Sequence, residues 1–289
     1  GLRTVLWYER TFETGNLSAT FPNRNAFADY AALGLIAVLA LIVDRAGRPE
    51  PAGRRTWLWT AAMFFKYVIG RSWILVYAAL VLFTAILLTH SRAGLVAALF
   101  GCGVFFCCAL RGRSSLRSAV LGTAITVAVA GFLGWAAGDG LSDRLTKLPD
   151  ASVERFTIYE LTFGMIAERP LFGTGLGSFA DLFPAVRPPE IRARIDYAHN
   201  SYLENALEMG LPAAIAFYAG ILLVGSIFVR AQLRRTAPQP WAAVGLGALS
   251  LTGLHAFFDY SAQFPAVAIT LAALLGAAAA RCAVPAPSR

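Results

Sequence analysis

Seven apolar segments, each long enough to cross a bilayer as a helix, constrain this chain more than any other feature. The hydrocarbon core of a bilayer is about 30 Å thick and needs about 20 mostly apolar residues in a helix. In lipid, only helices and closed barrels satisfy every backbone polar group. The sequence therefore predicts an all-α, polytopic transmembrane helical bundle. Its spans are expected at 26–43, 72–89, 93–110, 118–137, 212–229, 241–258 and 264–280.

The charges of the chain indicate its topology. Hydrophobic residues make up 57% of the sequence and charged residues 15%, whereas soluble proteins average about 25% charged residues. A net charge of +8 could indicate a nucleic-acid partner. However, the arginines lie in short clusters between the apolar segments, as the positive-inside rule describes. We therefore expect a membrane protein with no nucleic-acid partner.

Every second connection between spans is basic, which predicts the orientation of the chain. The basic clusters lie at 45–55, 111–117, 230–235 and 281–289, and we assign them to the cytoplasm. The start of this chain is then outside and its end is cytoplasmic. The short apolar stretch 56–70 would disturb this alternation as a span, so it is predicted to be an interfacial helix. Three parts follow: 1–137 with four spans, an outer loop 138–208, and 209–289 with three spans.

The long outer loop carries its own helical signals. A helix is predicted at 152–168, with Ser152 or Asp150 as its N-cap and Pro170 beyond its end. A glycine-rich turn at 173–177, a proline-rich link at 184–189 and a short helix at 200–209 follow.

Two arginines and two glycines on the outer side are candidates for binding an anion. Arg92 lies in a turn too short to leave the membrane, so it either snorkels to the interface or binds an anion. Arg155 lies in the first turn of the predicted loop helix, where the helix dipole disfavours a cation; an ion pair with a loop carboxylate is the simpler explanation. Gly173 and Gly175 could expose backbone N–H groups to a phosphate, although a plain tight turn also explains them.

His199 is the sharpest single candidate, because it is the only histidine of the long loop. A neutral imidazole can take a proton from a sugar hydroxyl, although such a histidine is often purely structural. His255 and Asp259 lie one helical turn apart and could pair with each other or with an arginine across the bundle; we favour a structural pair. The cysteines and histidines show no spacing typical of a disulfide framework or a metal site. We therefore expect no metal and no cofactor, and any phosphate chemistry would rely on arginine.

Five sequence motifs, in their order along the chain, resemble those of the O-antigen ligase and polymerase superfamily of bacterial membrane glycosyltransferases. The matching pieces are 19–25, 91–94, Arg155, 169–179 and His199-Asn200. In the ligase branch the pattern begins with a histidine followed by Asn, Ser or Gln. Nine residues of any type follow, then a glycine, two further residues of any type, and a Gly, Thr or Tyr. Gly210 fits this pattern, whereas Ala213 departs from it, which weakens assignment to the ligase branch.

The resemblance implies a fold and an activity. Members typically have about twelve spans, so we expect these seven to be the last of a larger bundle, with about five before Gly1. The loop would be periplasmic and the protein would lie in the bacterial inner membrane. Members move a glycan from undecaprenyl diphosphate, a lipid carrier, to an acceptor hydroxyl without a metal. Arg92 and Arg155 would bind the diphosphate and His199 would activate the acceptor. Asn200, Gly173 and Gly175 would contribute to substrate binding.

Several alternatives stay open at this point. The donor would be a lipid-linked oligo- or polysaccharide, but the acceptor could be lipid A-core, a second lipid-linked glycan (a polymerase) or a protein. A membrane transporter is the alternative from another class. A transporter should carry ionisable residues and broken helices at mid-membrane. Here the charged residues lie at span ends and in the loop, which favours chemistry at the outer interface.

Overall fold

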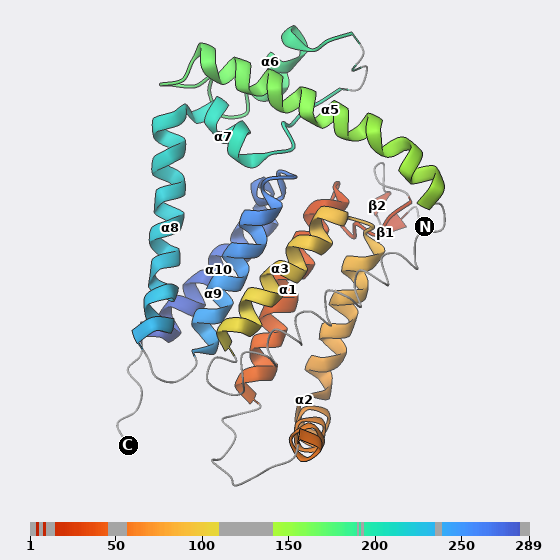
Figure 1. The fold of residues 1–289 in the computed structure, drawn as a ribbon, viewed down its shortest axis with the longest axis vertical. Coiled ribbons are helices and arrows are strands. Elements are labelled where there is room, and N and C mark those ends of the chain that lie inside the picture. Colours follow the sequence, from red (N-terminus) through yellow and green to blue (C-terminus); the bar gives the residue numbers. More distant parts are fainter. Residues whose placement is uncertain are drawn as a thin grey trace.

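The computed structural model describes residues 4–5, 8–9, 15–45, 57–109, 141–189, 191, 194–234 and 239–283, and of these 4–5, 8–9, 57–71 and 141–154 in backbone alone. Within these ranges the chain is almost entirely helical (Figure 1). The exceptions are a short antiparallel pair, β1 (Thr4–Val5) with β2 (Tyr8–Glu9), and a 3-10 turn, η1 (Ser261–Gln263). The helices are α1 (Arg24–Arg45), α2 (Trp57–Leu88), α3 (Arg92–Ala109), α5 (Leu141–Glu168), α6 (Phe179–Val186), α7 (Ser201–Met209), α8 (Leu211–Arg234), α9 (Pro240–His255) and α10 (Pro265–Ala283).

Among the described residues, four helices are long and apolar enough to cross a membrane: α1, α3, α8 and α10. They coincide with four of the seven predicted spans. The predicted span 72–89 is a shorter apolar helix, Ser72–Leu88, and 241–258 is the 16-residue α9. The segment 118–137 lies outside the described residues. A helical membrane protein is therefore confirmed, whereas the number of seven spans and their orientation stay predictions.

The helix α9 lies at the centre of the bundle, packed against α1, α3, α8 and α10. Small residues allow its closest approach, which is to α3. A Cβ on Gly101 would lie 2.8 Å from the Gly247 carbonyl oxygen, and one on Gly247 would lie 2.9 Å from the Gly101 carbonyl oxygen. Such small-residue contacts are typical of helix packing in membranes, where backbones come close together. The core around them is aliphatic and aromatic, including Ile36, Phe105 and Leu251.

The helix α2 consists of two parts joined by a kink. Ser72 has non-helical backbone angles (φ −132°, ψ 19°), and Figure 1 shows the part before it turned away from the part after it. This boundary agrees with the predicted break between the stretch 56–70 and the span 72–89. Its position at the membrane interface stays a prediction.

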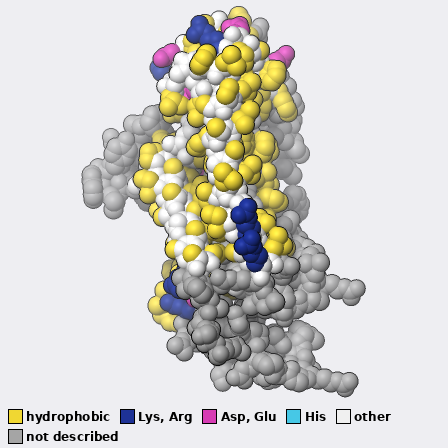
Figure 2. All heavy atoms as spheres, turned by 90° about the vertical axis from the view of Figure 1, so that its left-hand side faces the viewer, with side chains coloured by type: hydrophobic (Ala, Val, Ile, Leu, Met, Phe, Trp, Pro, Cys, Tyr) yellow, Lys and Arg dark blue, Asp and Glu magenta, His cyan; other side chains and the backbone are white. Residues whose placement is uncertain are grey.

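The side of the molecule formed by α8 is apolar and exposed (Figure 2). Ile215, Leu222, Leu223 and Leu233 are each at least 66% exposed. An apolar surface of this extent needs an apolar environment, as lipid tails would supply. In Figure 1 the C-terminal ends of α1, α8 and α10 lie opposite α5–α7. All three helices carry an arginine in their last turn, in agreement with the predicted alternation of charge.

The loop forms a helical layer over one end of the bundle, with α5 lying across it (Figure 1). A second, smaller core holds this layer together, including Ile158, Phe179, Phe183 and Leu207. The start predicted for the first loop helix is wrong, because α5 begins at Leu141 rather than at 152. Ser152 and Asp150 are therefore not N-caps. The proline-rich link is also partly helical, since α6 continues through Pro184 to Val186.

Candidate functional site

The short helix α7 supports the candidate site, and residues of the His-Asn motif determine its length. The Asn200 side chain accepts hydrogen bonds from the backbone N–H groups of Tyr202 (3.0 Å) and Leu203 (3.1 Å), so Asn200 is the N-cap. The nine residues of α7 then end at Gly210, whose φ of 80° favours glycine. The spacing of His199, Asn200 and Gly210 is thus the length of one capped helix.

A close backbone contact seats the far end of α7 on the glycine-rich turn. A Cβ on Gly210 would lie 2.4 Å from the Leu171 carbonyl oxygen, and one on Gly173 would lie 2.4 Å from the Gly210 nitrogen. The Leu211 N–H also donates to the Pro170 carbonyl at 2.8 Å. Two glycines are therefore required where the turn crosses the corner between α7 and α8.

The N–H groups of the glycine-rich turn are used within the protein. Gly173 N–H donates to the Arg169 carbonyl, Thr174 N–H to Leu207 and Gly175 N–H to Glu208. The last two bonds satisfy carbonyls at the C-terminus of α7, which its own helix leaves unpaired. Phosphate binding through the backbone of Gly173 and Gly175 is therefore not supported, and the tight turn is the better interpretation.

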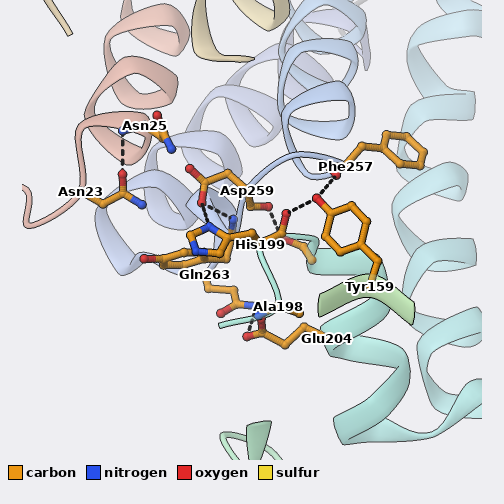
Figure 3. A network of polar contacts seen from close by, with 11 residues as sticks. Asn23, Asn25, Tyr159, Ala198, His199, Glu204, Phe257, Asp259 and Gln263 are labelled. Carbon is orange, nitrogen blue, oxygen red and sulfur yellow. Dashed lines mark hydrogen bonds and ion pairs between the residues drawn. The ribbon is translucent and has the colours of Figure 1, made fainter. Parts of the chain in front are cut away.

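His199 lies immediately before α7 in a left-handed backbone conformation (φ 54°) and faces Asp259 (Figure 3). Its Nδ1 lies 3.7 Å from Asp259 Oδ1, and the two side chains are 30% and 0% exposed. This distance fits an ion pair but exceeds a hydrogen bond. Because Nδ1 faces the carboxylate, Nε2 is the imidazole nitrogen left to meet a substrate. The arrangement matches the general pattern of a base oriented by a third group.

The buried carboxylate of Asp259 is positioned to stabilise a positive charge on His199. Its Oδ1 accepts the Tyr260 N–H at 2.8 Å, whereas its Oδ2 has no hydrogen-bond partner among the described residues. Burial alone would raise the pKa of this carboxyl, but His199, His255 and the Tyr260 N–H outweigh it and lower the pKa. A buried carboxylate is costly unless a cation pairs with it. The buried Asp259 carboxylate is therefore the negatively charged partner that faces His199.

Hydrogen bonds join three chain segments around this pair. The Tyr159 hydroxyl on α5 donates to the carbonyls of His199 (3.0 Å) and Phe257 (3.3 Å), as Figure 3 shows. The Ser201 hydroxyl on α7 donates to the Asp259 carbonyl at 3.0 Å. The loop layer is thus fastened to the turn between α9 and α10, which brings residues about 60 positions apart in sequence together.

Glu204 holds the segment that precedes His199. It is 3% exposed, and its carboxyl accepts the Ala198 N–H at 2.6 Å and the Gln263 side-chain amide at 2.9 Å. Burial raises the pKa of Glu204 to about 7, although these two hydrogen bonds act in the opposite direction. Glu204 therefore links α7, the His199 segment and η1.

A comparison with protein families identifies the family to which part of this chain belongs. The sequence model of the family described as O-antigen ligase matches residues 77–218. Residues 77–218 form a domain of the O-antigen ligase family. Members of this family are membrane enzymes of the O-antigen ligase and polymerase type, which transfer glycosyl groups and use lipid-linked glycans. A search of curated protein sequences found no match to the chain.

All the site residues predicted from the sequence lie within the O-antigen ligase match. Asp259, which the structure adds to the site, lies outside it.

Arg92 is the first residue of α3, at the end of the bundle that the loop covers, and its side chain is exposed. Arg155 is also exposed and lies one helical turn before Tyr159 on α5. Burial raises the pKa of Tyr159, and the positive charge of Arg155 partly offsets this rise.

The predicted position of Arg155 in the first turn of the loop helix is wrong. Because α5 begins at Leu141, Arg155 lies in the middle of the helix and not in its first turn. The helix dipole acts only within the terminal turns, so it does not disfavour a cation there. No ion pair of Arg155 or Arg92 is found among the described side chains. Both side chains are exposed.

The predicted pairing of His255 with Asp259 is also wrong. His255 Nδ1 instead lies 3.5 Å from Asp29 Oδ2 on α1, and both side chains are 1% exposed. Asp259 pairs with His199. Asp259 lies in the turn after α9, and its side chain faces His199 of the loop. His255 is the last residue of α9, and its side chain faces Asp29 in the bundle.

Sequence reasoning missed four contributors to the site: Asp259 as the partner of His199, Tyr159, Glu204 and Gln263. Only Glu204 could have been suspected from the local sequence, because it is an acidic residue in the first turn of a short helix. The described residues contain no group of three or more His, Cys, Asp or Glu side chains that could bind a metal ion.

Proposed function

We propose that the protein is a glycosyltransferase that moves a glycan from undecaprenyl diphosphate to an acceptor hydroxyl on the periplasmic face. In this proposal the acceptor is lipid A-core or a similar glycan, as in an O-antigen ligase. The observation that carries the proposal is the His199–Asp259 pair beside α7. The His199 side chain is partly exposed, so a substrate can contact it, whereas Asp259 is buried behind it. The family match supports the class of donor.

His199 would act as the general base. Its Nε2 takes the proton of the acceptor hydroxyl while the oxygen forms a bond to the anomeric carbon of the donor sugar. The bond from that carbon to the diphosphate oxygen breaks, and undecaprenyl diphosphate leaves with the electron pair. This single displacement inverts the anomeric centre. Asp259 stabilises the imidazolium that forms, and a placed base contributes about 10²–10⁴-fold to the rate.

Arg92 and Arg155 would bind the diphosphate. Guanidinium groups hold phosphate oxygens through two parallel hydrogen bonds and keep their charge at every working pH. They would offset the negative charge that grows on the leaving group, so no metal is needed in this scheme. The exposure of both side chains and their lack of a described ion pair support this role.

Two other acceptors belong to the same chemistry. Ala213 departs from the ligase pattern, which favours the O-antigen or exopolysaccharide polymerase as the second candidate. A protein O-oligosaccharyltransferase is the third. A membrane transporter is the candidate from another class, and the one buried ionisable pair in the described bundle, His255 with Asp29, lies toward the loop end of α1 and α9.

The test is an in vitro transfer reaction with the purified full-length protein and an undecaprenyl diphosphate-linked glycan. Separate reactions supply lipid A-core, a second lipid-linked glycan, or an acceptor protein, each with and without EDTA. We expect transfer to one acceptor, insensitivity to EDTA, and a loss of at least 100-fold in His199→Ala. Arg92→Ala and Arg155→Ala should also lose activity.

Arg234→Ala is the matched control, because Arg234 is an exposed arginine at the opposite end of the bundle. Full activity in His199→Ala would contradict the role of the base. Solute uptake in proteoliposomes that survives both Arg92→Ala and His199→Ala would favour the transporter instead.

A further inference from the structure

We propose that Tyr197, stacked on Tyr260 beside His199, is a platform that binds a pyranose ring of the acceptor glycan. This inference rests on the proposed transferase function. It adds a binding residue on the side of the site from which the acceptor hydroxyl would approach.

The two tyrosine rings form a face-to-face stack next to the candidate base. Their centroids are 3.8 Å apart and their planes differ by 10°. Tyr260 also meets the His199 ring edge-on, with centroids 5.3 Å apart, and its N–H donates to Asp259. Tyr197 and His199 thus contact the same ring. A ligand that stacks on Tyr197 and extends past the edge of its ring would therefore approach His199.

The outer tyrosine is available to a ligand. Tyr197 is 37% exposed, and Tyr260 covers one face of its ring. Tyr260 also packs against Phe264, with ring centroids 5.7 Å apart, and the Phe264 and Phe21 centroids are 6.4 Å apart. The stack therefore continues into the aromatic residues at the outer end of the bundle and leaves Tyr197 as its accessible end.

The chemistry of such a surface fits a sugar. A pyranose ring has one face of C–H groups and a rim of hydroxyls, so it is apolar on one side and polar at its edge. The face of an aromatic ring is electron-rich and attracts the polarised C–H groups of a sugar. Small-molecule sites commonly combine such aromatic surfaces with a few polar groups that orient the ligand. Here His199 supplies the polar group, and a hydroxyl at the sugar rim is the group that it would deprotonate.

A purely structural role for the stack makes a different prediction. If Tyr197 only stabilised the loop, its removal would lower the unfolding temperature and reduce kcat together with the affinity for both substrates. If it binds the acceptor, its removal raises KM for the acceptor alone. The aromatic ring, and not the hydroxyl, is the group required.

The experiment measures KM for each substrate in Tyr197→Ala, Tyr197→Phe and Tyr197→Trp. One series uses rough lipopolysaccharide, which carries lipid A-core without O-antigen, and a second uses an undecaprenyl diphosphate-linked glycan as acceptor. We expect Tyr197→Ala to raise the acceptor KM about 3- to 10-fold, as the loss of one stacking contact implies. The donor KM and kcat should stay unchanged, and Tyr197→Phe and Tyr197→Trp should behave like the wild type.

Tyr77→Ala is the control, since Tyr77 is an exposed tyrosine on the apolar part of α2. An unchanged acceptor KM in Tyr197→Ala, or an equal rise for donor and acceptor, would overturn the inference. An inactive wild-type protein would contradict the proposed function, and a binding measurement then still tests the platform.

That measurement uses saturation-transfer NMR with core oligosaccharide released from rough lipopolysaccharide by mild acid. His199→Ala should bind this probe, and His199→Ala combined with Tyr197→Ala should bind it several-fold more weakly. Equal binding by the two variants, or none by either, would refute the platform regardless of catalysis.

Discussion

Replacing Glu204 with glutamine should remove a pH dependence of stability that is built into the site. Glu204 is 3% exposed, and burial raises its pKa from 4.5 to about 7. In the unfolded chain the carboxyl loses its proton near pH 4.5, whereas the folded protein keeps it until about pH 7. The folded state binds more protons in this window, so stability falls as the pH rises through it.

The size of the effect follows from the two pKa values. Each unit of difference corresponds to about 1.4 kcal/mol, so ionised Glu204 costs the folded state about 3 kcal/mol above pH 7. Glutamine has the same shape without the charge. Its oxygen can accept the Ala198 N–H, and its amide can donate to Gln263 once that side chain has rotated.

Thermal unfolding of the detergent-solubilised protein between pH 4.5 and 8 measures this difference. We expect Glu204→Gln and the wild type to unfold at similar temperatures at pH 4.5. At pH 8 the variant should be more stable by roughly 5–10 °C. Glu160→Gln serves as the control, because Glu160 is an exposed carboxylate on α5. A difference that stays constant with pH, or a variant that is less stable at pH 8, would refute the reasoning.

Three further predictions concern α7 and the histidine pair. Asn200→Ala removes the N-cap and should cost about 1 kcal/mol in unfolding measurements, with Asn200→Asp largely restoring it. Gly210→Ala places a Cβ against the Leu171 carbonyl at positive φ and should destabilise by about 1–3 kcal/mol, whereas Gly220→Ala on α8, where the space is open, should not. Asp259→Asn removes the negative charge that would stabilise the imidazolium formed during transfer, so kcat should fall at least tenfold while the donor KM stays constant; unchanged kcat would show that Asp259 does not assist His199.

The helical class and the order of the motifs could be predicted because they depend on local sequence. Hydropathy over about 20 residues indicates a membrane span wherever it lies in the fold. The helix α7 was predicted within one residue, since Asn200 and Gly210 are capping residues that act on their own neighbours. The start of α5 was missed because the helix continues through Pro149, which local rules treat as an interruption.

The partners of the histidines were decided by the tertiary structure. His255 and Asp259 are close in sequence, so a local pair was the natural expectation, yet His255 meets Asp29 on α1 and Asp259 meets His199. These contacts depend on how α1, α9 and the loop pack, and side-chain types alone do not encode that packing. The sequence by itself determined that the chain is a helical membrane protein with His199 at the start of a capped helix. Only the packing of the loop onto the bundle paired that histidine with a buried carboxylate 60 residues away, because an ion pair requires two side chains within about 4 Å in space rather than along the chain.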